Sequence, residues 1–481
     1  MTRLQGLLDR QPPELIVPEA RSTIRHANVA SGRRFAVLDD DPTGSQSVHD
    51  VSLVTALDRV EYERALAEPG SVAFILTNTR ALDEHDAVAR TTAIGADIAA
   101  LEASGVGPIS VVSRSDSTLR GHVIAEVRAL DAVRRHADSS GYDGVLFVPA
   151  FFDAGRVTID DVHWVVSGGD AVPAADTEFA KDATFGYRAR TLPEFLVERS
   201  AGSLDPASIV SLSLDDIRRG GPDRVAHVLL SAPSGSIIVV NAAAPSDLEV
   251  VTLGLQRAEQ QGHRFLHRCG PSFVRALAGI EPTAPLTIES VAPAITRPRA
   301  HGVVIVGSHV GLTTRQLAAA RALGGLADVE VDASALADRG GASDEIDRAV
   351  ARIATQIADA DVVVATSRAL VRGDDPTSSL AIGRRISDGL VAITRGVAPL
   401  EPAWVVAKGG ITSHDVVQRG LDIRRGRVIG QVLPGAISVL LPEEAPTTVL
   451  GMPVVIFPGN VGGETALADT LALLRGAGQR G

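Results

Sequence analysis

Short apolar runs alternate along the chain with longer segments in which apolar residues recur every three or four positions. In the first half, seven apolar runs predict strands at 35–38, 51–55, 72–77, 109–113, 145–149, 208–212 and 237–241. Between them, segments 85–103 and 119–136 have helical spacing, and Ile94, Ile98 and Leu101 share one face of the first. This alternation predicts βαβ units and a mostly parallel sheet.

This alternation of predicted strands and helices is interrupted twice. Residues 150–190 are rich in Gly, Asp and Thr and are expected to form a long functional loop region. Residues 281–300 contain four prolines and mark the best domain boundary. After it, strands are predicted at 303–307, 328–331, 361–366, 404–407 and 453–457, and helices near 312–324, 344–359, 377–394 and 463–475. The sequence therefore predicts an α/β protein of two α/β domains.

Composition narrows the class of protein. Of 481 residues, 45% are hydrophobic but only 3% aromatic, so aliphatic side chains must fill the core, as in parallel sheets covered by helices. The net charge of −12 argues against a broad nucleic-acid surface, although a local basic pocket for a small anion remains compatible with it. The single cysteine, Cys269, excludes an intrachain disulfide. With no apolar run of membrane-spanning length and no signal-peptide core, we expect a cytoplasmic protein without membrane contact.

The first candidate site follows strand 35–38, where the sequence reads FAVLDDDPTGSQ. Asp39, Asp40 and Asp41 come at the carboxyl end of the strand, which is where ligands bind in open α/β sheets. Three adjacent acids repel one another unless a metal ion, an arginine or a proton is present. The alternative is a solvated acidic turn that caps the next element.

The stretch VVSRSDSTLRGH at 111–122 offers an acid and a base together. A helix is expected to begin near Ser117 or Thr118, with Asp116 and Arg120 beside the strand end. The guanidinium of Arg matches a carboxylate bidentately, so the stretch suits binding of an organic acid. The alternative is a capped helix with a local ion pair.

Two further arginines are candidates for the same purpose. Arg80 follows strand 72–77 in FILTNTRALD, and Arg156 lies in the irregular region in AGRVT. The alternative for Arg80 is an ordinary polar loop between a strand and a helix.

In the second half, glycines replace charges at the strand ends. WVVAKGGITSHDVV at 404–417 and VVIFPGNVGGETAL at 454–467 each run from a strand through a glycine turn into a helix, and IVGSHVGLTTRQL at 305–317 places Ser308 at a third such turn. Glycines allow the backbone to approach phosphate oxygens closely. The alternative is turns without a ligand. The chain has no GxxxxGK[ST], GxGxxG, HExxH or CxxC motif at the expected places, so a P-loop, a dinucleotide-binding fold and a zinc site are not supported.

Taken together, these stretches resemble the four-carbon acid sugar kinase family. The resemblance runs from about residue 35 to about 475 and rests on eight pieces: DDPTG at 40–44, TNTRA at 77–81, SDSTLRG at 115–121, AGRVT at 154–158, GS at 307–308, TSR at 366–368, KGGITS at 408–413 and FPGNVGG at 457–463. It implies ATP-dependent phosphorylation, with Mg²⁺, of a sugar acid such as a threonate, an erythronate or a 3-oxo-tetronate.

The resemblance also implies domain roles. Residues 1–30 are an N-terminal extension, 31–290 a sugar-acid-binding domain and 300–481 a nucleotide-binding domain, with the active site in the cleft between the two domains. A homodimer is a further expectation.

Carried over by position, the resemblance implies roles for individual residues. Asp40 and Asp41 are the catalytic candidates. Substrate binding is expected of Arg80, Asp116, Arg120 and Arg156. ATP binding is expected of Ser308, Gly409, Gly410, Ile411, Thr412, Gly459, Asn460 and Gly462. No residue is assigned to a metal.

The sequence departs from the family pattern in places. The family usually has DDLTGA, whereas Pro42 and Ser45 occur here and Asp39 adds a third acid, and Arg114 stands near the place of a common Lys. Two other functions stay open: a non-catalytic sensor of sugar acids and nucleotides, and a metal-dependent aldolase or epimerase that uses no ATP.

Overall fold

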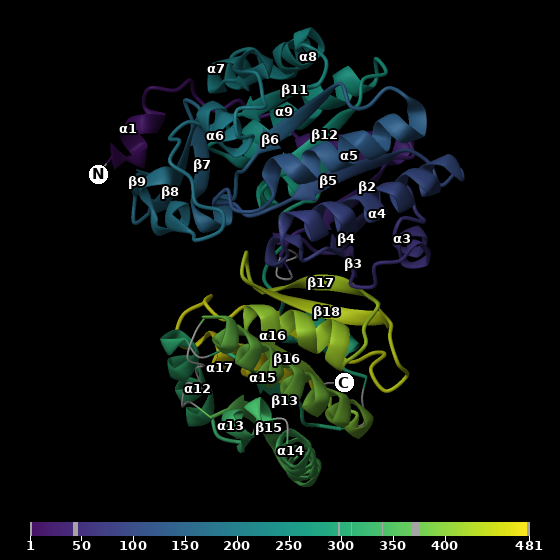
Figure 1. Cartoon of the computed structure of the whole chain (residues 1–481), viewed down its shortest axis with the longest axis vertical. Coiled ribbons are helices and arrows are strands. Elements are labelled where there is room, and N and C mark those ends of the chain that lie inside the picture. The colour runs from purple at the N-terminus through teal and green to yellow at the C-terminus, as the bar shows by residue number, and fades with distance from the viewer. Residues whose placement is uncertain are drawn as a thin grey trace. The chain divides into compact units, whose positions relative to one another are not determined.

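A computed structural model describes residues 2–41, 47–296, 299–308, 310–338, 340–367 and 376–478, without the side chains of 376–380 and Ile411. Parts of the predicted stretches, including Pro42, Gly44 and Arg368, lie outside the described residues. The chain forms two compact units (Figure 1). Unit 1 contains Met1–Ser47 and Leu57–Pro282, and unit 2 contains Val48–Ala56 and Thr283–Gly481.

Unit 1 is built on a parallel sheet of seven strands. Their order is β10 (Ile209–Leu212), β11 (Ser236–Val240), β6 (Gly144–Val148), β12 (Phe265–Cys269), β5 (Ile109–Arg114), β2 (Arg34–Asp39) and β4 (Val72–Leu76). Apolar runs had predicted all of these strands except β12. Its sequence FLHRC contains His267 and Arg268, so the run does not look like a buried strand, yet all five of its residues are buried.

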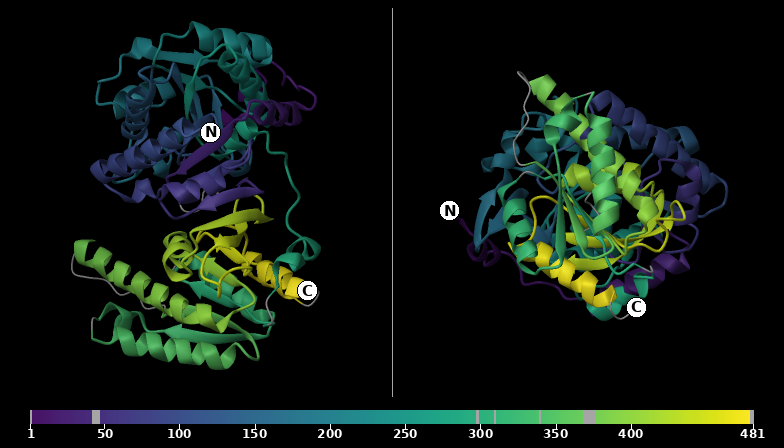
Figure 2. Two further views of the ribbon diagram at one scale, coloured as in Figure 1. Left: turned by 90° about the vertical axis from the view of Figure 1, so that its right-hand side faces the viewer. Right: turned by 90° about the horizontal axis from the view of Figure 1, so that it is seen from below.

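Helices cover both faces of this sheet (Figures 1 and 2). On one face, α4 (Glu84–Ala103) packs against α5 (Val123–Asp138). On the other, α2 (Ala20–Ala30), α9 (Pro245–Glu259) and α10 (Pro271–Ala278) contact one another. Shorter or peripheral helices are α1 (Leu4–Leu8), α3 (Arg59–Ala65), α6 (Leu192–Arg199), α7 (Leu214–Arg218) and α8 (Gly221–Ser231). As predicted, Ile94, Ile98 and Leu101 of α4 are buried together.

The helix expected near Ser117 or Thr118 begins only at Val123, so that prediction was wrong. Leu119 has a φ of +72° and Gly121 a φ of +115°. A right-handed helix cannot pass through residues in that conformation, so residues 115–121 form a turn instead. Asp116 and Arg120 therefore lie on a loop and not in the first turn of a helix.

Residues 150–190 are more regular than the sequence suggested. They contain β7 (Arg156–Ile159), β8 (Val162–Ser167) and β9 (Asp170–Pro173), which form an antiparallel sheet with β1 (Thr2–Arg3) in the order β1-β9-β8-β7. Each hairpin turns through two residues with positive φ, Asp160 with Asp161 and Gly168 with Gly169. Such pairs are typical of tight hairpins, so the prediction of a long loop misread hairpin turns as irregular chain.

Unit 2 has a sheet with a parallel and an antiparallel part. The parallel strands are, in order, β14 (Leu326–Val331), β15 (Asp361–Thr366), β13 (Val303–Val306), β16 (Val405–Lys408) and β19 (Val454–Phe457). The antiparallel strands β18 (Ile437–Glu444), β17 (Arg425–Leu433) and β3 (Val51–Val54) extend it beyond β19. The hairpin of β17 and β18 had not been predicted. The segment that carries β3 packs with unit 2 although it lies within the first half of the sequence.

Helices also cover the sheet of unit 2. One group contains α11 (Ile288–Val291), α12 (Gly311–Ala322) and α17 (Ala466–Gly478). A second group contains α13 (Ala333–Ala337), α14 (Ala342–Gln356) and α15 (Pro376–Val397), and α16 (Gly410–Asp415) follows β16. In the described part of the chain, no helix has both the length and the apolar character needed to cross a bilayer. The predicted class, two α/β domains with mostly parallel sheets, is confirmed.

Candidate active site

The acidic stretch lies at the carboxyl edge of the unit 1 sheet, where three neighbouring strands end. β5 lies between β2 and β12, and the register pairs Asp39 with Arg114 and Cys269 with Arg114. Residues next to these three positions are therefore close together, although they lie far apart in the sequence. This edge gathers Asp40, Asp116 and Arg268.

Asp39 has a structural role. It is fully buried, and Arg114 Nη1 donates a hydrogen bond of 2.8 Å to its Oδ1. The same oxygen accepts the backbone N–H of Asp41 at 3.1 Å. Burial raises the pKa of Asp39 to about 6, even though Arg114 acts in the opposite direction. Asp39 thus fixes the start of the loop that carries the other two acids.

Asp40 differs from both neighbours because its carboxylate is buried without a partner. The side chain is 2% exposed, and within the described residues neither carboxylate oxygen accepts a hydrogen bond. Its backbone N–H donates to the carbonyl of Arg114 at 3.2 Å, which fixes its position. Burial raises the pKa of Asp40 to about 7, while Arg80 and Arg268 oppose the rise. Asp40 is thus a carboxyl group able to exchange a proton near neutral pH.

Arg268 lies beside Asp40 and was not found from the sequence. Its Nη1 donates to Ser113 Oγ at 2.7 Å and to the carboxylate of Glu126, and the side chain is fully buried. Within the described residues its Nε and Nη2 have no acceptor. A Cβ on Gly121 would lie 3.0 Å from Asp40 Oδ2 and 3.2 Å from Arg268 Nη2. A side chain at position 121 would therefore crowd both groups.

A second network joins the remaining acids to two arginines. Arg80 forms ion pairs with Asp41 and, at 3.1 Å, with Asp116. Arg120 Nε donates to Asp116 Oδ2 at 2.8 Å, and its Nη1 lies 3.9 Å from Asp182. Burial alone would raise the pKa of Asp116, but Arg120 and Arg80 together with Thr118 lower it to about 2. Asp116 is therefore a permanent anion that orients both guanidinium groups.

Arg156 joins this region through an aromatic ring. The guanidinium carbons of Arg120 and Arg156 each lie 5.6 Å from the ring centroid of Phe179. Arg156 also donates to the carbonyl of Ala154. The structure thus brings all six predicted substrate-side residues to one region of unit 1.

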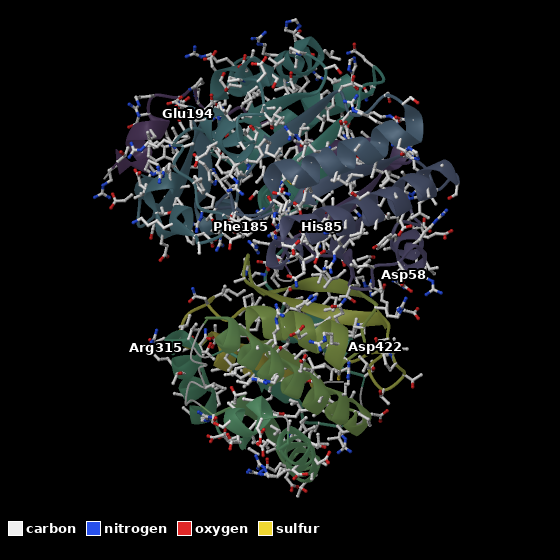
Figure 3. The ribbon with its side chains drawn as sticks, viewed as in Figure 1. Asp58, His85, Phe185, Glu194, Arg315 and Asp422 are labelled. Carbon is white, nitrogen blue, oxygen red and sulfur yellow. The ribbon has the colours of Figure 1, made fainter. Side chains whose placement is uncertain are left out.

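Figure 3 shows that Phe185 also lies in unit 1, and its ring packs edge-on against His122 with 5.0 Å between centroids.

In unit 2, the three predicted glycine or serine turns also lie at neighbouring strand ends. β16 lies between β13 and β19, and the register pairs Lys408 with Val306 and with Phe457. Residues 307–308 and the turns at 409–410 and 458–463 therefore follow adjacent parallel strands and meet at one edge.

Close approach at this edge explains the glycines. A Cβ on Gly459 would lie 2.9 Å from Ser308 Oγ and 3.7 Å from the Cα of Gly409. Gly409 has a φ of +134°, and a Cβ there would lie 2.9 Å from Thr412 Oγ1. Thr313 Oγ1 lies 3.0 Å from Ser308 Oγ and 3.2 Å from the carbonyl oxygen of Gly459. The three turns thus form one tightly packed main-chain surface.

The other predicted residues of this edge differ in their surroundings. Gly462 has a φ of +78°, and Gln316 holds its turn by donating to the carbonyls of Val461 and Gly463 at 3.0 and 2.9 Å. Gly410 and Asn460 are exposed, and the side chain of Ile411 lies outside the described part.

Beyond the turn, Arg315 of α12 pairs with Glu464 at 2.6 Å (Figure 3). Both side chains are more than half exposed.

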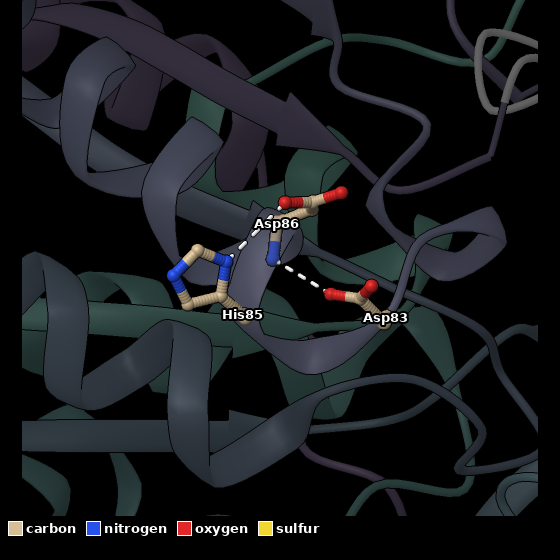
Figure 4. Close-up of side chains that lie close together, drawn as sticks. All are labelled: Asp83, His85 and Asp86. Atoms are coloured by element: carbon tan, nitrogen blue, oxygen red, sulfur yellow. Dashed lines mark hydrogen bonds and ion pairs between the residues drawn. The ribbon is translucent and has the colours of Figure 1, made fainter.

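One group of acidic and histidine side chains has the spacing to bind a metal, but its arrangement has a structural explanation. Asp83, His85 and Asp86 lie close together at the start of α4 (Figure 4). Asp83 caps the helix by accepting the N–H of Asp86 at 2.9 Å, and His85 Nδ1 lies 3.3 Å from Asp86 Oδ1. All three residues are exposed. Helix capping accounts for the arrangement without a metal.

Comparison with known proteins gives the two units their class. Residues 35–277 match a family described as a sugar-binding N-terminal domain, and residues 303–467 match a nucleotide-binding C-terminal domain. The protein thus combines a sugar-binding and a nucleotide-binding domain in one chain. It belongs to the four-carbon acid sugar kinase family, which this pair of domains defines, and the predicted resemblance is confirmed.

Solved structures with the same fold have low sequence identity. A protein from Salmonella typhimurium LT2, provisionally called a tRNA synthase, is 16% identical with a TM-score of 0.69, and the match covers 91% of this chain and 98% of that one. A Haemophilus influenzae protein of family DUF1537 is 17% identical with a TM-score of 0.65, and coverage is 91% and 100%. At this identity the likeness shows the fold alone. Among curated proteins, no sequence matches this chain.

Proposed function

We propose that this protein is a kinase that transfers the γ-phosphoryl group of ATP to a hydroxyl group of a small sugar acid. The observation that carries the proposal is the carboxylate of Asp40 in the sugar-binding domain, which is buried and has no partner among the residues that the structure describes. A phosphoryl acceptor hydroxyl needs a nearby proton acceptor with a pKa close to neutral. The pKa of Asp40, raised to about 7 by burial, meets this need.

The arginines of the second network would bind the carboxylate of the substrate. The side chains of Arg80 and Arg120 are 17% and 30% exposed, so both are reachable by a small ligand. Asp116 holds both guanidinium groups in place, and its low pKa keeps it charged. Guanidinium groups bind carboxylates bidentately, which favours an acid over a neutral sugar. Arg156, which also lies 5.6 Å from the ring centroid of Phe179, would complete the site.

Asp40 would then act on the substrate hydroxyl. As the bond between the hydroxyl oxygen and the phosphorus forms, the carboxylate of Asp40 accepts the hydroxyl proton, and the bond to ADP breaks. Asp41 is less suited to this role, because it is already paired with Arg80. Arg268, whose Nη2 has no acceptor among the described residues, would orient an oxygen of the same substrate from beside Gly121.

The glycine turns of unit 2 would bind the nucleotide. A Cβ on Gly409 or Gly459 would come within 2.9 Å of a neighbouring side chain, so close packing of main chain is the property these turns preserve. Bare main chain of this kind presents N–H groups to phosphate oxygens. The hydroxyl groups of Ser308 and Thr412 lie at the same place and add hydrogen-bonding capacity.

Mg²⁺ would accompany the nucleotide and neutralise charge on its phosphates. In the described part of the turns, Glu464 is the nearby acid, and it is paired with Arg315. The turns therefore fit a metal that is bound mainly by phosphate oxygens and water, which is common for Mg²⁺.

The experiment that tests this function measures ADP release with ATP, Mg²⁺ and a panel of four-carbon sugar acids. We expect release with one or a few acids and none with the matching neutral sugars, because the arginines select a carboxylate. A sensor would bind these acids without turnover, and an aldolase or epimerase would convert them without ATP. Either outcome would contradict the proposal.

The domain boundaries at 31–290 and 300–481, the active site between the domains and the homodimer stay predictions.

A further inference from the structure

Lys408, the last residue of β16, is a fully buried cation at the centre of the glycine turns. Its Nζ donates to the carbonyl oxygens of Pro458 and Gly459 at 3.0 and 3.3 Å. It also lies 3.9 Å from the ring centroid of Phe457. The ammonium group thus has hydrogen-bond acceptors and a favourable aromatic face, but these partners are neutral.

Lys408 differs from three other buried cations, each of which has an acidic partner. Arg114 pairs with Asp39, Arg218 with Asp247 and Arg268 with Glu126. Among the residues that the structure describes, no carboxylate forms an ion pair with Lys408. Burial lowers the pKa of Lys408 to about 8, and no charged neighbour contributes to this shift. Burying a charge without a counter-charge is costly, which indicates that an anion completes the site when the protein is at work.

The hydrogen bonds of Lys408 also orient the turn that follows β19. A trans peptide directs its C=O and N–H to opposite sides. Because the carbonyls of Pro458 and Gly459 point inward to Lys408, the N–H groups of Gly459 and Asn460 point the other way. Within the described part of the chain neither N–H donates to a protein acceptor, and Asn460 is exposed. Two free N–H donors therefore face outward above a buried positive charge.

We propose that Lys408 is a positioning residue for the phosphate groups of the nucleotide. Its ammonium group holds the carbonyls of residues 458 and 459 inward so that the following N–H groups bind the phosphates, and its charge is balanced when the phosphate anion binds. The inference rests on the proposed nucleotide role of this edge, and it adds a residue that acts through the main chain.

The test compares the affinity for ATP and for adenosine in Lys408→Met, measured by calorimetry on the full-length protein. The substitution keeps the length of the side chain and removes the charge. We expect ATP binding to weaken about 10- to 100-fold, as for loss of charge-assisted hydrogen bonds, while adenosine binding is unchanged. Lys408→Arg, which keeps the charge, should retain more of the ATP affinity than Lys408→Met.

Melting of the nucleotide-free protein separates this role from a merely structural one. Because Lys408→Met removes an unbalanced buried charge, the free protein should melt at the same or a higher temperature than wild type. Val406→Ala on the same strand is the matched control, since Val406 is fully buried and its truncation should lower the melting temperature without changing ATP affinity.

Two results would overturn the inference: ATP affinity of Lys408→Met within twofold of wild type, or equal weakening for ATP and adenosine. If Lys408→Met does not fold, the ATP affinity of Lys408→Arg decides instead, and a loss equal for ATP and adenosine contradicts the role. A wild-type protein that binds no ATP would contradict the proposed function itself, which is a different result.

Discussion

The carboxyl edges of the two parallel sheets in this protein are built in opposite ways. In unit 1 the edge consists of charged side chains, with Arg80, Arg114 and Arg120 each paired to an acid. In unit 2 the edge consists of main chain, with glycines where side chains would collide and with the buried Lys408, which forms no ion pair with any described residue. Side-chain charges can select one small acid by the arrangement of its groups, whereas main-chain N–H groups suit the repeated oxygens of a polyphosphate. If the proposed function is correct, the equivalent edges of the two sheets serve two kinds of recognition.

The largest effect is expected for Asp40, the acid at the unit 1 edge whose carboxylate has no partner among the described residues. Asp40→Asn removes the proton acceptor with little change in shape, so kcat should fall by about 10²- to 10⁴-fold. Asp41→Asn should cost less, because Asp41 is bound to Arg80 and serves to orient it. Steady-state kinetics of both variants measure the difference. A larger fall in kcat for Asp41→Asn than for Asp40→Asn would mean that Asp41 is the base.

The main-chain edge of unit 2 should be sensitive to one added methyl group. Gly409→Ala places a Cβ at a φ of +134° and 2.9 Å from Thr412 Oγ1. We expect ATP affinity to fall about 10- to 100-fold, because the strained turn shifts its N–H groups. Gly463→Ala is the matched control, since a Cβ there meets no atom within 4 Å. Equal ATP affinity in the two variants, measured by calorimetry, would count against a main-chain phosphate site.

The guanidinium fork of Arg120 should matter more than its charge. Arg120→Lys keeps the charge but loses bidentate geometry, so we expect KM for the sugar acid to rise about tenfold with little change in KM for ATP. Arg135→Lys is a close control, because Arg135 Nε also binds an acid four residues earlier, Asp131, at 2.7 Å on an exposed helix. An unchanged KM for the acid in Arg120→Lys would remove Arg120 from the substrate site.

A dependence on pH is also expected, and within one unit of neutral pH it is no larger than about tenfold. Burial raises the pKa of Asp40 to about 7, so below that pH the carboxyl group is protonated and cannot accept the proton of the hydroxyl. The value of kcat/KM should therefore fall about tenfold per pH unit below this pKa and level off above it. A pH–rate profile checks this limb, and a profile flat from pH 5.5 to 8 would contradict Asp40 as the base.

Much of the fold could be predicted because most buried strands are plain aliphatic runs. β12 could not, since Arg268 looks exposed in the sequence and only the distant partners Ser113 and Glu126 make its burial possible. The hairpins of β7 to β9 and of β17 with β18 were missed for a different reason. The cores that these hairpins form are small or lie on one side only, so apolar and polar residues alternate weakly along their strands. The turn residues were therefore the dominant signal in the sequence.

The candidate site, like the fold, could be predicted only in part. The sequence indicated which strand ends carry acids and which carry glycines, because these residues directly follow apolar runs. The resemblance set Asp40 and Asp41 apart from Asp39, but the sequence did not show which of the two is the better base, because that difference depends on which acid meets Arg80. Lys408 is the first residue of the KGGITS stretch at 408–413. Its burial and its acceptors, the carbonyls of residues 458 and 459, could not be predicted because they depend on a strand that lies fifty residues later.

The placement of Val48–Ala56 has a consequence for synthesis of the chain. β3 pairs within unit 2 with β17, which begins only at Arg425. An emerging polypeptide must therefore carry this strand without β17 until most of the protein has been made, and these two strands can pair only then. A shortened protein that starts at Thr283 would leave one side of β17 open to strand pairing with other molecules, so the halves are expected to be inseparable in practice.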